Sequence, residues 1–79
     1  MAERGVREIF AESVRRERTA RGWSMEELGR RAGINRATVS TIEAMKGGAT
    51  LDVAALLAGA FGLTIGALAD GPAGGGDRG

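Results

Sequence analysis

The stretch that decides the fold lies between residues 23 and 43 and reads WSMEELGRRAGINRATVSTIE. Ser24 can cap the start of a helix, and Glu27 three residues later can reach back to it, which makes a capping box. Gly33 can end that helix in the left-handed conformation. Asn35 is a good cap for a second helix. The stretch therefore predicts two short helices joined by a turn of about three residues.

The side chains of this stretch indicate which surfaces are buried. Two helices joined so tightly must cross at a steep angle, and Gly29 and Ala32 supply the small side chains that such a contact needs. Val39 and Ile42 are three residues apart on the second helix and are expected to face inward. The remaining outward positions are small or polar apart from one arginine: Arg36, Ala37, Ser40 and Thr41. Such a face suits entry into the major groove of DNA.

The flanking segments predict three further helices. Residues 6–21 form a first helix with Ile9, Phe10 and Val14 on one stripe, and Gly22 ends it. The helix that starts at Asn35 is expected to run to about Met45.

Thr50 caps a fourth helix, which ends at Gly62. Its apolar stripe consists of Leu51, Ala54, Leu57, Ala58 and Phe61. Thr64 begins a short fifth helix through Ala69. The fold class is therefore all-α, with one folded domain over residues 6–70. Residues 71–79, GPAGGGDRG, are expected to be a disordered tail or the start of a linker to a further domain.

Composition limits the chemistry that the 79 residues can support. The chain has no cysteine, histidine or tyrosine, so a thiolate or imidazole metal site and a nucleophile–base pair are not expected. We expect no catalytic residue, no cofactor and no metal, and hence no enzyme. The net charge is +1, but every basic residue except Arg78 lies at or before Lys46. That asymmetry is compatible with a DNA-facing surface and equally with a solvated helix face.

The uncharged segment 53–69 is too short and too diluted by alanine and glycine for a membrane span, which needs about 20 apolar residues. We therefore expect a cytoplasmic protein.

The stretch 23–43 resembles the helix-turn-helix of the phage-repressor, or Cro/C1-type (XRE family), transcriptional regulators. The resemblance extends over about residues 10–68, including the restart at Thr50-Leu51 and the junction Phe61-Gly62-Leu63-Thr64. It implies a compact five-helix lambda-repressor-like domain that binds double-stranded DNA, with its third helix contacting the bases.

The resemblance also assigns roles to individual residues. Arg36, Ala37 and Thr41 match the positions that contact base edges in phage repressors. Phosphate or supporting contacts are implied for a second set: Asn35, Thr38 and Ser40. The family tends to pair an arginine of the first helix with a glutamate of the third, and Arg18 and Glu43 match those positions.

Three residues depart from the family pattern. Met25 stands where the family often has a glutamine on a phosphate, so backbone N–H groups at Ser24 and Met25 would have to make that contact. Ala37 offers only a methyl group, which suits the methyl group of thymine. Met45 replaces the usual glycine after the third helix, so the loop there is expected to differ in shape.

Other interpretations of single residues stay open at this point. Trp23 could stack on single-stranded nucleic acid, but its place next to the cap favours core packing. Arg36 could contact a base, contact a phosphate or be solvated, and we favour DNA contact because arginine to guanine is the commonest specific pair. Lys46, the only lysine, could bind a phosphate or serve solubility.

The sequence thus predicts a sequence-specific DNA-binding regulator, most simply a repressor or autoregulator. Two alternatives are an antitoxin-like protein-interaction module and the N-terminal DNA-binding domain of a larger ligand-sensing regulator. A single domain offers few base contacts, so we expect a homodimer, at least on DNA. Its contact surface is expected on the fourth and fifth helices, which carry Leu56, Leu63, Ile65 and Leu68. The alternative is that these four residues complete the core of one domain.

Overall fold

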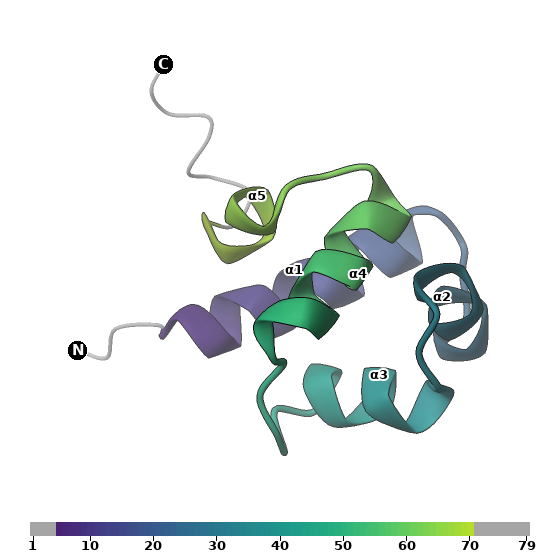
Figure 1. Cartoon of the computed structure of the whole chain (residues 1–79), viewed down its shortest axis with the longest axis horizontal. Coiled ribbons are helices and arrows are strands. Elements are labelled where there is room, and N and C mark those ends of the chain that lie inside the picture. Colours follow the sequence, from purple (N-terminus) through teal and green to yellow (C-terminus); the bar gives the residue numbers. More distant parts are fainter. Residues whose placement is uncertain (1–4, 71–79) are drawn as a thin grey trace.

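The fold consists of five helices arranged around one core (Figure 1). The computed structural model describes residues 5–70, and no strand occurs within that range. The helices are α1 (Val6–Ala20), α2 (Met25–Ala32), α3 (Arg36–Glu43), α4 (Leu51–Phe61) and α5 (Ile65–Asp70). No helix among the described residues is long and apolar enough to cross a membrane. The prediction of an all-α domain is therefore confirmed.

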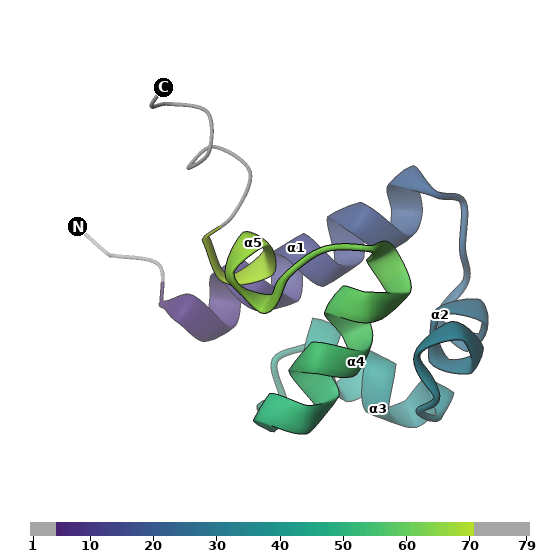
Figure 2. The same ribbon diagram turned by 45° about the horizontal axis from the view of Figure 1, so that its top comes forward.

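The packing order places α3 at one side of the domain. The most extensive helix contacts join α2 to α3 and α1 to α5. Both views of the ribbon show α5 lying against α1 and away from α3, with α4 packed across α1 (Figures 1 and 2). The outward side of α3 is therefore left uncovered by the other helices.

Four helices begin where the sequence places a capping side chain. The side chains of Ser24, Asn35, Thr50 and Thr64 each accept a hydrogen bond from the backbone N–H three residues later, at 2.8–3.1 Å. These bonds satisfy N–H groups that the first turn of a helix leaves without partners. The capping box at Ser24 is only half formed, because the Glu27 carboxylate contacts two arginines of α2 instead of the Ser24 backbone.

The end of α3 differs from the prediction. The helix stops at Glu43 and not near Met45, because Met45 takes the left-handed conformation at φ 60°. The Met45 N–H donates to Ile42 O at 3.0 Å and the Lys46 N–H donates to Thr41 O at 3.0 Å. Gly22 closes α1 with the same two-bond pattern. Met45 thus adopts the geometry that glycine usually provides at a helix end.

The core is formed by the inward faces of all five helices. Its largest fully buried apolar side chains are Leu28, Leu57, Leu68, Val14 and Val39. One residue of the predicted apolar stripe of α4 is not buried, since Leu51 is 74% exposed. Leu51 lies at the mouth of an apolar cavity of about 220 Å³ between α1, the α3–α4 loop, α4 and α5. Leu51 therefore borders a hollow, whereas Ala54, the next residue of the stripe, is buried in the core.

Candidate nucleic-acid interface

The junction between α2 and α3 is fixed by close backbone packing. A Cβ atom at Gly29 would lie 2.6 Å from Ile34 O, so only glycine allows the chain to approach so closely there. Gly29 O accepts hydrogen bonds from the N–H groups of Gly33 at 2.8 Å and Ile34 at 2.9 Å. Gly33 itself is left-handed, with φ 80°. These contacts hold the start of α3 in one position relative to α2.

The helical period divides α3 into a buried and an exposed side. Val39 and Ile42 are buried in the core. Arg36, Ala37 and Thr41 are exposed, and Ser40 is half-buried. We call these four residues the α3 outer face. The structure thus brings together the residues that the resemblance places at base edges.

Two polar residues at the start of α3 serve the helix itself. Asn35 is exposed and Thr38 half-buried. Asn35 Oδ1 accepts from Thr38 N at 2.8 Å and from Thr38 Oγ1 at 2.9 Å. Because these bonds use the oxygen, the amide nitrogen of Asn35 remains a donor for another group.

The α3–α4 loop forms one edge of this surface. A shallow hollow over α3 is lined by residues of α3, its cap and the loop: Asn35, Ala37, Thr38, Thr41, Ile42 and Gly48. Gly47 packs so closely that a Cβ atom there would lie 3.0 Å from Thr41 Cγ2. Lys46 is exposed in the same loop. The sequence did not indicate Gly47 and Gly48 as part of this surface, because the packing of a loop on a helix leaves no local sequence signal.

The residues at the start of α2 offer little side-chain chemistry to a ligand. Met25 is half-buried and packs against the core. Ser24 is exposed, and its hydroxyl oxygen accepts from the Glu27 N–H at 3.0 Å. The hydroxyl hydrogen and the free N–H groups of this first turn are therefore the donors available here.

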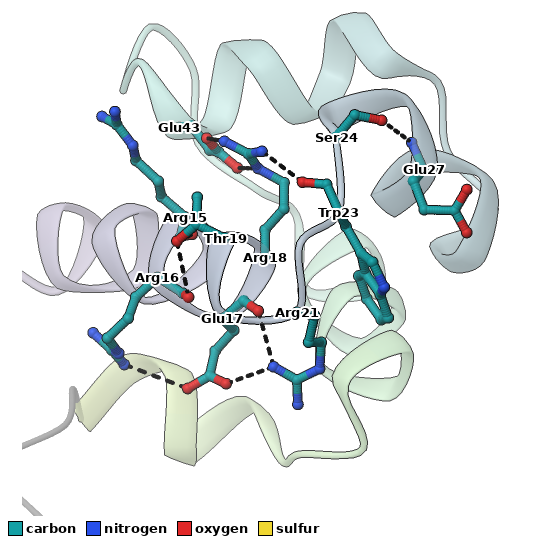
Figure 3. Close-up of polar contacts among 10 residues, drawn as sticks. All are labelled: Arg15, Arg16, Glu17, Arg18, Thr19, Arg21, Trp23, Ser24, Glu27 and Glu43. Carbon is teal, nitrogen blue, oxygen red and sulfur yellow. Dashed lines mark hydrogen bonds and ion pairs between the residues drawn. The ribbon is translucent and has the colours of Figure 1, made fainter.

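A buried ion pair joins α1 to the end of α3 (Figure 3). Arg18 donates to both carboxylate oxygens of Glu43, from Nε at 2.7 Å and from Nη2 at 3.0 Å. Its third nitrogen, Nη1, donates to Trp23 O at 2.8 Å. The two side chains are only 12% and 4% exposed. The hydrogen bonds to Glu43 raise the pKa of Arg18, although burial opposes this, so the guanidinium stays protonated.

Trp23 belongs to a stack of side chains that closes the junction of α1, α2 and α4. Its ring lies 5.8 Å from that of Phe61 at an interplanar angle of 13°. The guanidinium of Arg31 lies 4.3 Å from the Trp23 ring, and that of Arg21 lies 4.9 Å from the Phe61 ring. Cation–π contacts of this kind stabilise the cluster. With Phe61 and Arg31 against its ring, Trp23 is not a free platform for a nucleic-acid base.

Comparison with known proteins agrees with this geometry. A family model described as "Helix-turn-helix" matches residues 14–68. The hypothetical transcription factor NHTF from Neisseria is 32% identical with a TM-score of 0.82, and the match covers 91% of this chain and 83% of that one.

Two structures of the clp gene regulator ClgR from Corynebacterium glutamicum share the fold at 19% identity. One has a TM-score of 0.75 over 85% of this chain and 71% of that one, and the other has 0.78 over 98% and 100%. The comparison with curated proteins gave no match. The family match covers most of the chain and includes both helices of the junction. The chain therefore belongs to the XRE-type helix-turn-helix family of DNA-binding transcriptional regulators.

Proposed function

We propose that the chain binds duplex DNA sequence-specifically by placing α3 in the major groove. The observation that carries this proposal is the α3 outer face, which no other helix covers while Val39 and Ile42 fix the opposite side in the core. The major groove is wide enough for one helix, and its floor displays a distinct set of donors and acceptors for each base pair. A rigid helix with small and polar exposed residues fits that space.

Each residue of the interface has a proposed role. Arg36 donates to a guanine, Thr41 hydrogen-bonds a base edge, and the methyl group of Ala37 contacts a thymine methyl group. Phosphates are contacted by polar side chains, backbone N–H groups and one lysine at the edges of the face: Asn35, Thr38, Ser40, Ser24, Met25 and Lys46. At Met25 the contact would come from the backbone, because its side chain packs against the core.

Binding that blocks transcription is the simplest use of such a domain, so repression or autoregulation in the cytoplasm remains our proposal for its role. Selection of bound sequences from a random duplex pool tests the proposal directly. We expect one enriched motif. Arg36→Ala should weaken binding to it by roughly 1–3 kcal/mol and relax the preference at one base position.

Lys46→Ala is the matched control for Arg36→Ala. It should weaken binding to all duplexes alike and reduce the slope of log K against log salt by about one unit. If Arg36→Ala also weakens every duplex equally, Arg36 contacts only phosphate. If no motif is enriched, sequence-specific binding is wrong.

We further propose that the domain binds as a homodimer, on a surface that differs in part from the predicted one. Leu68 is fully buried, and Leu63 and Ile65 pack against the domain's own core. These three residues therefore complete one domain, as the alternative held. Exposed apolar area remains at Leu56, 46% exposed, and Leu51, 74% exposed.

Sedimentation with and without a selected duplex tests the dimer. We expect two chains on a palindromic site, with half-sites about 34 Å apart centre to centre. A 1:1 complex on a site without symmetry would contradict the dimer and leave DNA binding intact. Leu56→Ser should weaken the dimer, whereas Val6→Ser, at another exposed apolar side chain, gives a matched control on α1.

A further inference from the structure

Arg7 lies far from α3 in the sequence, yet its side chain meets the loop that follows α3. A Cβ atom at Gly48 would be 3.4 Å from both Nε and Nη2 of Arg7. The guanidinium therefore lies directly over the Gly48 backbone, in the first turn of α1 and beside the α3–α4 loop. Because Gly47 and Gly48 have no side chains, this part of the loop places no side chain between the Arg7 guanidinium and α3.

Gly48 connects Arg7 to the proposed DNA surface. The same residue lines the shallow hollow over α3 with Ala37 and Thr41. The positive charge of Arg7 thus lies at the border of the α3 outer face, on the side where α3 ends. Arg36 is the first residue of α3 and belongs to the face itself, and Lys46 follows the end of the helix. Arg7 therefore adds a cation at the border of the face from a different element, α1.

Arg7 is also available for a new partner. It is exposed, and no carboxylate among residues 5–70 forms an ion pair with it. By contrast, five other arginines pair with glutamates in that part of the chain: Arg16, Arg18, Arg21, Arg30 and Arg31. An arginine with free donors binds a phosphate well, because its planar fork of N–H groups matches two phosphate oxygens.

DNA geometry supplies the partner. A helix inserted into the major groove, about 12 Å wide, has a phosphate backbone along each side of it. A cation beside the exposed face, but outside the inserted helix, then faces one of these backbones and not the bases. We propose that Arg7 binds a phosphate of the DNA backbone beside the groove that α3 enters. The proposal depends on the DNA binding proposed above.

The test measures affinity for a labelled random-sequence duplex of about 20 base pairs across a range of salt concentrations. A phosphate contact does not depend on sequence, so no selected site is needed. Arg7→Gln should weaken binding about fivefold and reduce the salt slope by about one unit. Arg7→Lys should restore the salt slope, because it keeps the charge, but only part of the affinity, because it lacks the planar fork.

Arg16→Gln is the matched control. Arg16 is nine positions later on α1, which at 3.6 residues per turn places it on the opposite side of the helix. Arg16→Gln should leave the salt slope unchanged. An equal loss of slope in Arg16→Gln and Arg7→Gln would show only an effect of net charge, and would overturn the proposal.

Two further outcomes separate this proposal from the proposed function. If the unmodified chain binds the duplex and Arg7→Gln binds equally well with the same slope, the Arg7 contact is wrong while DNA binding stands. If the unmodified chain itself shows no salt-dependent binding, the proposed function has failed. Sedimentation also measures whether Arg7→Gln still forms the dimer. If the variant loses both affinity and the dimer, Arg7 acts in assembly and the phosphate contact is wrong.

Discussion

At its start α3 is held by backbone atoms, whereas at its end it is held by side chains. Gly29 lets the α2–α3 turn approach closely, and the two N–H groups that donate to Gly29 O fix that turn. At the other end, Glu43 is tied to Arg18, and the chain leaves the helix through a left-handed methionine. The start of α3 depends on the absence of a side chain at Gly29. The end of α3 depends on which side chains are present.

The largest effect is expected at the end of α3. Glu43→Ala leaves the largely buried Arg18 charge without its partner and should lower the free energy of unfolding by about 3 kcal/mol. Denaturant unfolding measures this. Glu17→Ala removes the same side chain from a more exposed pair with Arg21 and should cost under about 1 kcal/mol. An unchanged midpoint in Glu43→Ala would show that side chains do not hold this end.

The start of α3 should respond to the smallest possible addition. Gly29→Ala places a methyl group 2.6 Å from Ile34 O, a backbone atom, and should lower stability by about 2 kcal/mol while shifting α3 relative to α2. Gly59→Ala in α4 is the control, because a Cβ atom there meets nothing within 4 Å. That control should gain up to about 1 kcal/mol. If both variants behave alike, close packing does not fix the turn.

The smallest effect concerns the left-handed residue. Met45→Gly removes the strain of a side chain at φ 60° but gives the unfolded chain more freedom, so a net gain of about 0.5 kcal/mol is expected. Ala44→Gly, one residue earlier at φ −85°, has no strain to relieve and should lose about 0.5–1 kcal/mol. Thermal unfolding should therefore show a gain in stability for Met45→Gly and a loss for Ala44→Gly. A loss at both would indicate that the Met45 side chain contributes more by its contacts than its backbone costs.

The same difference between local and distant contacts decides which features of the fold could be predicted from the sequence. The starts of the helices were predicted from Ser24, Asn35, Thr50 and Thr64, because a capping side chain acts on a backbone N–H only three residues away. Glycine after α2 is likewise a local signal. The division of α3 into a buried and an exposed side follows from the helical period alone.

What sequence reasoning missed depends on contacts between distant segments. Leu51 fits the apolar stripe of α4, but its exposure is set by the hollow that it borders. The hydrogen bonds around Met45 override the preference of a non-glycine residue for right-handed φ. The pairing of Arg18 with Glu43 was implied only by the family resemblance, and the place of Arg7 beside Gly48 follows from the packing of α1 on the loop.

The exposure of Arg36 and Ala37 has a consequence for how such a domain diversifies. Neither residue belongs to the core, and the bonds that cap α3 come from Asn35. Their side chains can therefore be exchanged with little change in the free energy of unfolding. Surface substitutions away from the core and the helix caps usually change it by no more than about 0.5 kcal/mol. If Arg36 and Ala37 contact bases as proposed, mutation at these two positions can explore new target sequences one step at a time while the domain stays folded. A library randomised at residues 36 and 37 is the natural starting point for retargeting this scaffold.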